Sequence, residues 1–355
     1  MSRNVLITAA SGHIGEELVP ILLPLNHVRL ILPTSNASRL QTKFSSKPHF
    51  SDEECVIEEG SVANPGWFQG LLTKYHVDTV FCCLTGEDEL FTTMNSIDCM
   101  IKSGTVKHLI YLSAGADFHT PEGVAQLYRD STSAHVMVKV VIEQKIRFGH
   151  LPFSWTILRP MLFFVNDIRT KQAMLTDGLY AEPLPDKPLS RVAPGDIALA
   201  VKNIVLDTTG KWKGQHIYIG SAKGYTGPEI AKIWSSALGK EIRMLDSGES
   251  GLQHVEDHLS RIGRPNWGRD IRLMYETFAL RGFEMPESEY PKQVELLGKE
   301  PDDYENWVKR DSRRLGIVYV LPRLSLLWHA CLRMAGVRVK LLELSKLENP
   351  SSYRN

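Results

Sequence analysis

The stretch NVLITAASGHIG, residues 4–15, decides how this chain folds. It begins with a short apolar run that is typical of a buried strand, and a helical pattern opens directly behind it. A turn of small residues, from Thr8 to Gly15, lies between the two. Such a turn lets the backbone approach an anion closely, and the helix N-terminus offers it free N–H groups and a partial positive charge. The stretch therefore predicts a dinucleotide-binding turn between a first strand and a first helix.

The two glycines of this turn have different expected roles. Gly12 permits the close approach of the phosphates, and Gly15 lets the helix pack against the strand. Ala9 departs from the pattern, because it stands where the first glycine is usual. A tight turn in some other α/β protein is the alternative interpretation. We expect the cofactor to contact residues Thr8, Ala10, Ser11, Gly12, His13, Ile14 and Gly15.

Up to about residue 160, short apolar runs alternate with helical patterns, which is typical of a parallel sheet with crossover helices. Strands are predicted at residues 4–8, 28–32, 55–59, 79–84, 108–113 and 154–159. Helices are predicted at residues 16–25, 67–75, 90–103 and 134–148. The predicted fold class is therefore α/β, with a doubly wound parallel Rossmann sheet in residues 1–160 that binds NAD(P).

The remainder of the chain predicts two further parts. Residues 161–316 contain a proline-rich loop region, a helix at 196–206, a strand at 216–220, a helix at 228–238 and a charged helical segment at 248–298. We expect them to form a smaller α/β lobe that binds the substrate. In residues 317–355, Pro322 precedes an apolar stripe at helical spacing. This extension is predicted to be an amphipathic helix that docks on the core, forms a homodimer with a second subunit, or lies on a membrane surface.

Composition limits the partners. Lys plus Arg total 41 and Asp plus Glu total 41, so nothing attracts the chain to nucleic acid, and a small molecule is the expected partner. The five cysteines show no metal-ligand spacing, which favours a reducing, cytoplasmic location and no metal site. No charge-free apolar run reaches about 18 residues, so we expect no transmembrane segment.

The end of the second predicted strand favours NADP(H) over NAD(H). It contains Thr34, Ser35 and Asn36, with Arg39 and Lys43 just beyond. No acid lies in this stretch to repel a 2′-phosphate, and hydroxyl groups with Arg39 would hold one. We therefore place Thr34, Ser35, Asn36 and Arg39 in the cofactor site; the alternative is that Arg39 is a solvated helix residue.

Several later motifs carry a family resemblance. They are VKHLIYLS at 106–113, Lys139 followed by Glu143, LPFSWTILRP at 151–160 with Phe163 and Asn166, residues 192–197 around Asp196, and ENWVKR at 305–310. With these and the first turn, residues 3–316 resemble the NmrA-like branch of the atypical short-chain dehydrogenases/reductases. The resemblance implies an NADP-binding fold. Its members include reductases of natural products in secondary metabolism, redox-neutral cyclases or isomerases, and sensors that bind the dinucleotide without turnover.

The resemblance also implies a catalytic group on the helix at 134–148. In ordinary short-chain dehydrogenases a tyrosine lies four residues before a lysine on this helix, and here His135 precedes Lys139. Lys139 would bind the nicotinamide ribose. An imidazole exchanges protons near neutral pH, so His135 is either a proton donor or an ordinary polar helix residue. Ser113 matches the serine that hydrogen-bonds the substrate oxygen, or it merely caps the strand end.

The remaining candidate residues surround the expected nicotinamide. Leu84, Pro160 and Phe163 are expected to contact the cofactor, and Asp117, Phe163, Phe164 and Asn166 the substrate. Tyr180, Trp234 and Trp267 would complete an aromatic pocket. The leading hypothesis is an NADPH-dependent reductase of a ketone, imine or activated alkene in a bulky, largely apolar molecule. A redox-neutral cyclase or isomerase and a non-enzymatic NADP(H) sensor are the alternatives.

Overall fold

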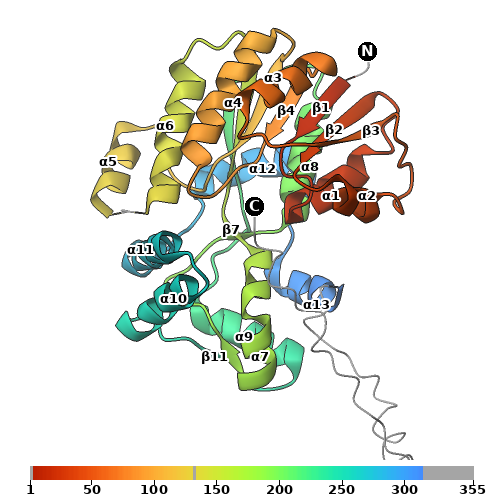
Figure 1. Ribbon diagram of the computed structural model, residues 1–355. Helices are drawn as coiled ribbons and strands as arrows, with labels where there is room; N and C mark the ends of the chain where they lie inside the picture. The colour runs from red at the N-terminus through yellow and green to blue at the C-terminus, as the bar shows by residue number, and fades with distance from the viewer. Residues whose placement is uncertain (1–2, 131–132, 315–355) are drawn as a thin grey trace, which may run out of the picture. The chain divides into compact units, whose positions relative to one another are not determined.

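The computed structural model describes residues 3–130 and 133–314, and these build a parallel sheet with helices on both faces (Figure 1). The sheet has seven strands in the order β10-β6-β5-β4-β1-β2-β3. The strands are β1 (Arg3–Ile7), β2 (Val28–Thr34), β3 (Cys55–Glu59), β4 (Thr79–Cys82), β5 (His108–Leu112), β6 (Ser154–Pro160) and β10 (Gln215–Ile219). The strand order reverses between β1 and β4, which is where open α/β sheets bind ligands.

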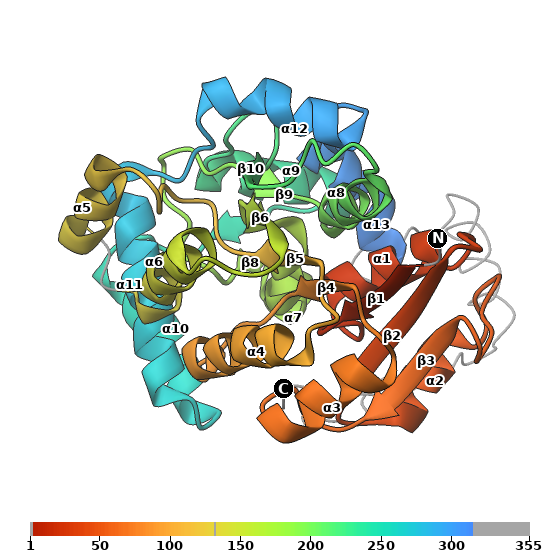
Figure 2. The ribbon, with the colours of Figure 1, turned by 90° about the horizontal axis from the view of Figure 1, so that it is seen from above.

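Two layers of helices cover the sheet (Figure 2). One layer contains α1 (His13–Leu22), α2 (Ala37–Phe44), α8 (Pro194–Leu206) and α12 (Tyr290–Leu297). The other contains α3 (Pro65–Lys74), α4 (Glu89–Ser103) and α6 (Ala134–Phe148). Because strand residues alternate between faces, Val5 and Ile7 pack against the first layer and Leu6 against the second. The predicted doubly wound Rossmann fold is confirmed.

One predicted strand lies in a different place from the one expected. The strand predicted at 216–220 was assigned to the smaller lobe, but β10 pairs with β6 as an edge strand of the main sheet. Helix α8 also packs on the sheet, beside α1. The chain therefore returns to the Rossmann sheet after residue 160. An isolated apolar run carries no information about its strand partner, which is why the sequence did not reveal this return.

The smaller lobe lies beyond the carboxyl ends of the strands, in the lower part of Figure 1. It contains η1 (Phe164–Thr170), α7 (Lys171–Asp177), β8 (Leu179–Tyr180), α9 (Gly227–Leu238), β11 (Arg243–Met244), α10 (Glu249–Arg261), α11 (Pro265–Arg281) and α13 (Tyr304–Arg314). Short connecting elements are β7 (Leu162–Phe163), β9 (Arg191–Val192), α5 (Pro121–Asp130) and η2 (Glu287–Glu289). The lobe is organised around buried Asp167, which pairs with Arg191 and accepts a hydrogen bond from Trp234.

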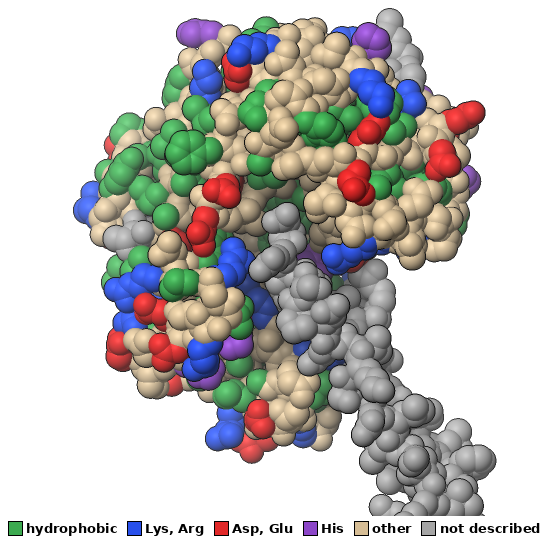
Figure 3. All heavy atoms as spheres, in the orientation of Figure 1, with side chains coloured by type: hydrophobic (Ala, Val, Ile, Leu, Met, Phe, Trp, Pro, Cys, Tyr) green, Lys and Arg blue, Asp and Glu red, His purple; other side chains and the backbone are tan. Residues whose placement is uncertain are grey.

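The surface differs between the two halves. Charged side chains gather over α10 and α11 in Figure 3, where Arg272 of α11 pairs with Glu249 and Glu256 of α10. This agrees with the charged helical segment predicted at 248–298. In residues 3–130 and 133–314, no helix is long and apolar enough to cross a membrane. The predicted extension at 317–355 lies outside the described residues.

Candidate functional site

The predicted phosphate turn lies at the point where the strand order reverses. Thr8 follows β1 and donates its backbone N–H to Phe81 O of β4, at 3.2 Å. Its hydroxyl accepts a hydrogen bond from Cys83 N–H, at 2.9 Å. These bonds tie the start of the turn to both central strands, so the N-terminus of α1 faces the edge where open α/β sheets bind ligands.

Gly15 has the packing role that the sequence suggested, and the space beside Gly12 is open. A Cβ on Gly15 would lie 2.3 Å from the carbonyl oxygen of Ala10, so only glycine fits between helix and turn. A Cβ on Gly12 would meet nothing closer than Ala9 O at 3.4 Å, and the space beside it stays open. Gly12 is the N-cap of α1 and contributes no side-chain bond to the first-turn N–H groups. The turn therefore fits a phosphate group.

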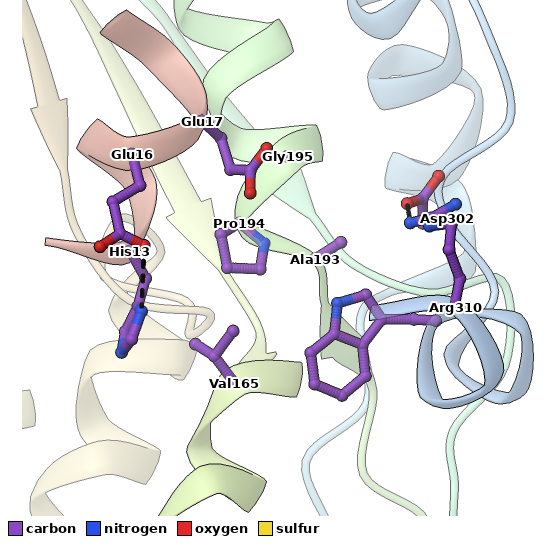
Figure 4. Close-up of a pocket in the computed structure, with 10 residues that line it drawn as sticks. His13, Glu16, Glu17, Val165, Ala193, Pro194, Gly195, Asp302 and Arg310 are labelled. Carbon is purple, nitrogen blue, oxygen red and sulfur yellow. Dashed lines mark hydrogen bonds and ion pairs between the residues drawn. The ribbon is translucent and has the colours of Figure 1, made fainter. Parts of the chain in front are cut away.

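The other turn residues divide into outer and inner positions. Ser11 and His13 are exposed, whereas Ala10 and Ile14 are buried in the core beneath the turn. Only the backbone of the buried pair is available to a cofactor. Figure 4 shows a small pocket beside the turn, lined by His13 on one side, by Gly195 at the start of α8, and by Arg310 of α13 on the opposite side.

Helix α2 carries two basic residues, Arg39 and Lys43, and Lys43 reaches the turn. Asn36 caps this helix, because its Oδ1 accepts the Arg39 N–H at 2.9 Å. The Arg39 side chain is exposed and has no side-chain partner in the described part of the chain. Lys43, one helical turn further, donates to Ser11 O at 2.6 Å and pairs with Glu16. The sequence analysis does not place Lys43 in the site. Its position four residues after Arg39 puts both residues on one face of the helix, which is the sequence pattern that indicates it.

One acid in this region was missed. Glu59 ends β3 and lies in register with Thr34 at the end of β2. Its Oε2 accepts the Ala37 N–H at 2.8 Å, at the first residue of α2. The sequence has no acid directly after the second strand, but the fold places Glu59 of the neighbouring strand β3 beside the end of β2.

Lys139 lies at the carboxyl ends of β4 and β5 and is almost completely buried. Its ammonium group pairs with Glu89 of α4, and these two side chains are 7% and 0% exposed. Tyr111 donates to the same Glu89 oxygen at 3.1 Å, and Lys139 also lies 3.4 Å from Leu112 O. Glu89 was not considered from the sequence. The sequence pattern that indicates it is an acid directly before the helix predicted at 90–103, which follows the fourth strand.

His135 is held by the smaller lobe. Its Nδ1 hydrogen-bonds Asp270 of α11, and the same nitrogen lies 2.8 Å from the hydroxyl of Ser133. Asp270 also accepts the Ala134 N–H at the start of α6. Burial alone would raise the pKa of Asp270, but the hydrogen bond and charge of His135 lower it. No hydrogen bond joins His135 to Lys139 or Ser113 in the described chain, so the structure does not link these three candidates directly.

Ser113 already has a partner for its proton. Its hydroxyl donates to Glu143 Oε1 at 2.6 Å, and Glu143 forms a fully buried ion pair with Arg159. Arg159 in turn lies 3.1 Å from His119 Nδ1, and Asp117 lies 2.6 Å from the same nitrogen. Ser113 and Asp117 therefore belong to one polar network behind the strand ends. Ser113 must release Glu143 before it donates to a substrate oxygen.

The aromatic wall predicted from the sequence is partly wrong. Phe164 is fully buried, with ring centroids 5.1 Å from Tyr304 and 5.4 Å from Trp307, so it packs the core of the lobe. Tyr180 and Trp234 are also buried there, bonded to Asp167. Leu84, Phe163, Asn166 and Trp267 are half-buried, and Pro160 is buried at the end of β6. Phe163 and Phe164 are adjacent, and the spacing of apolar residues around them does not indicate which of the two faces the core.

Solved structures with this fold differ in their reactions. An NADPH-dependent quinone oxidoreductase from Escherichia coli, complexed with NADPH, has a TM-score of 0.67 at 14% identity, covering 86% of this chain and 98% of its own. Triphenylmethane reductase from Citrobacter sp., complexed with NADP(H), has a TM-score of 0.66 at 16% identity, covering 85% and 98%. A nucleoside-diphosphate-sugar epimerase from Staphylococcus aureus has a TM-score of 0.69 at 15% identity, covering 86% and 100%.

These likenesses establish the fold, since the sequences are far apart. No curated protein matches the chain in a sequence comparison. A family model does match it, along residues 1–307, and that model describes the NmrA-like family. The chain therefore belongs to the NmrA-like family.

Proposed function

We propose that this protein binds NADP(H) and reduces a bulky, largely apolar small molecule at a ketone, imine or activated alkene, in secondary metabolism. The observation that carries the proposal is the α1 turn. Its glycines leave the first-turn N–H groups open at the strand-order reversal. Helix α2 reaches the turn through Lys43, and exposed Arg39 lies one helical turn before Lys43. A dinucleotide suits both features, because the helix N-terminus attracts the diphosphate and the guanidinium a 2′-phosphate.

Each residue of the proposed site has a defined task. The bound cofactor supplies the hydride. The α1 N–H groups hold the diphosphate, Arg39 and Lys43 hold the 2′-phosphate, and Lys139 orients the nicotinamide ribose. Asp270 accepts the Nδ1–H of His135, so the imidazolium form of His135 would donate its other proton to the substrate from Nε2. Phe163 and Asn166, both half-buried, are the residues proposed to contact the substrate.

Known relatives in fold support this choice without deciding it. The structure of the quinone oxidoreductase contains NADPH and that of the triphenylmethane reductase contains NADP(H). A quinone and a triphenylmethane dye are therefore the first acceptors to try.

The test is a titration of the purified protein with NADPH and, separately, with NADH, followed by reduced-nicotinamide fluorescence. We expect NADPH to bind more tightly than NADH. Arg39→Gln should weaken NADPH binding about tenfold and leave NADH binding unchanged, because a hydrogen bond to a charged group contributes about 1.5–3 kcal/mol. Binding of neither dinucleotide would refute the proposal.

A second candidate function is a dinucleotide sensor. It is favoured by Ser113, whose proton is engaged by Glu143, and by the histidine in place of the usual tyrosine. A sensor would bind NADPH as tightly as a reductase but consume none with any acceptor. A redox-neutral catalyst would turn over substrate with substoichiometric cofactor. The variant His135→Phe further distinguishes a reductase from a sensor. It should abolish a reduction that needs a proton from His135, and it should leave the NADPH affinity of a sensor nearly unchanged.

A further inference from the structure

We infer that Glu89 and Lys139 together form a clamp for a vicinal diol, and that the diol is that of the nicotinamide ribose. In this clamp the Glu89 carboxylate accepts a hydrogen bond from one ribose hydroxyl while the Lys139 ammonium donates to its neighbour. The inference deepens the proposed function and rests on it. It assigns a cofactor-binding role to an acid on α4.

The first observation is an unpartnered carboxylate oxygen. Glu89 is 2% exposed, and its Oε1 receives both Tyr111 and Lys139. Its Oε2 is equally buried and receives no hydrogen bond from the part of the chain that the structure describes. A buried polar atom without a partner is costly, and most such atoms in native proteins are satisfied. Glu89 Oε2 therefore calls for a donor that the protein does not supply.

The second observation is the unused capacity of Lys139. An ammonium group has three donors. One is bonded to Glu89, and a second points to Leu112 O at 3.4 Å, a long contact. The third has no acceptor among the described residues. An open acceptor and an open donor thus stand side by side on one ion pair, which matches two adjacent hydroxyl groups.

The third observation is the location of the pair. Lys139 bonds the last residue of β5, and Glu89 begins the helix that follows β4, the strand beside β5. Cys83, just past β4, bonds Thr8 at the start of the phosphate turn. A dinucleotide whose diphosphate lies at α1 would run along these strand ends toward Lys139.

The test compares two ligands on Glu89→Gln. The amide keeps the size of the side chain but removes the charge that receives the ribose hydroxyl. We expect NADPH to bind roughly tenfold more weakly or worse, because the lost bond is to a charged group. Adenosine 2′,5′-bisphosphate has no nicotinamide ribose and should bind equally to both proteins, which also shows that the variant is folded. Equal NADPH affinity in the two proteins would overturn the inference.

A matched control comes from the same helix face. Ser96 is two turns further along α4, buried, and its hydroxyl also lacks a partner among the described residues. Ser96→Ala should leave NADPH affinity unchanged; a loss equal to that of Glu89→Gln would mean that disturbing α4 suffices, and would overturn the clamp.

A second measurement needs no variant. The wild-type protein should bind an NADP⁺ analogue with a deoxyribose at the nicotinamide end about tenfold more weakly than NADP⁺, and Glu89→Gln should show no such difference. An identical penalty in both proteins would mean that Glu89 Oε2 holds a buried water instead. If the wild-type protein binds adenosine 2′,5′-bisphosphate and NADPH equally, the clamp fails while the proposed dinucleotide site stands. If it binds neither, the proposed function itself fails.

Discussion

The two ends of the candidate site are built in different ways. The phosphate end comes mostly from one contiguous stretch, residues 8–15, and the groups proposed to bind there are backbone N–H groups and exposed side chains such as Arg39. The nicotinamide end is assembled from side chains far apart in sequence. There Glu89 meets Lys139, Ser113 meets Glu143, and His135 meets Asp270.

This difference predicts how the two ends respond to change. At the phosphate end the polar groups wait for a ligand, so most substitutions there should alter affinity rather than stability. At the nicotinamide end the charged groups, apart from Glu89 Oε2, already pair with one another inside the protein, so removing one leaves a buried charge behind. Changes at that end should reduce stability first and chemistry second.

The largest effect is expected at the Glu143–Arg159 ion pair. Both side chains are 0% exposed, so Glu143→Gln leaves the Arg159 charge buried without a counter-charge. We expect the free energy of unfolding to fall by about 3–5 kcal/mol, measured by urea denaturation. Glu122→Gln, an exposed acid on α5, is the control and should change it by less than about 0.5 kcal/mol. Equal stability of Glu143→Gln and the wild type would remove the contrast between the two ends.

Next comes the pair of glycines in the turn. Gly15→Ala places a methyl group against the Ala10 backbone. We expect the free energy of unfolding to fall by about 1–3 kcal/mol, and NADPH binding to weaken as well. Gly12→Ala has room for its methyl group in the protein and should change stability by less than about 1 kcal/mol. It should nevertheless weaken NADPH binding, since the methyl group occupies space the diphosphate needs. Similar stability loss in both variants, measured by thermal unfolding, would contradict this division of roles.

Acid pH should destabilise the polar network around Arg159, because His216 packs against His119 of that network, with ring centroids 4.2 Å apart. Burial, and then the charge of Arg159, lower the pKa of His216 from 6.5 to about 3. Unfolded His216 takes up a proton below pH 6.5 while the folded residue stays neutral, so stability falls as the pH drops from 6.5 toward 3. Linkage over the two pH units from 6.5 to 4.5 gives about 2.7 kcal/mol. Because the His216 side chain is only half-buried, solvent screening should reduce this loss to roughly 1–2 kcal/mol at pH 4.5. His216→Gln should remove this loss, so the melting temperature of the variant should fall less than that of the wild type between pH 6.5 and pH 4.5. If the two melting temperatures fall in parallel, His216 is not the cause.

The same contrast, between local and distant residues, explains which parts of the fold the sequence predicts. The strands and the turn are encoded by neighbouring residues, through apolar alternation and the spacing of Gly12 and Gly15, and they were predicted near their observed positions. The seventh strand, β10, was found as a strand but placed in the wrong part, because its partner β6 lies about 60 residues earlier. Local pattern gives the element, and only packing gives its neighbour.

The candidate site shows the same limit at the level of side chains. Lys139 and His135 were predicted because they stand where ordinary short-chain dehydrogenases, which the chain resembles, have a lysine and a tyrosine four residues apart. Their partners Glu89 and Asp270 were not, since they lie 50 and 135 residues away along the chain. Whether a polar group is free or already bonded depends on such partners. A residue type in the right place therefore indicates a role, and the hydrogen bonds decide whether its proton is available.

The smallest effect is expected at Glu59, where the phosphate end carries one unfavourable charge. Glu59 accepts the Ala37 N–H and cancels part of the positive end of α2, close to where a 2′-phosphate would meet Arg39. Glu59→Gln keeps an oxygen for the cap and removes the charge, so NADPH should bind a few-fold more tightly, about 0.5–1 kcal/mol, and NADH no better. Because Glu59 is exposed, the gain should shrink as salt is raised from 0.05 to 0.5 M. Glu53→Gln, exposed ahead of the same strand, should leave the ratio of NADH to NADPH dissociation constants unchanged. If Glu59→Gln weakens NADH binding instead and leaves NADPH unaffected, then Glu59 binds ribose hydroxyls and the phosphate end is built for NAD(H).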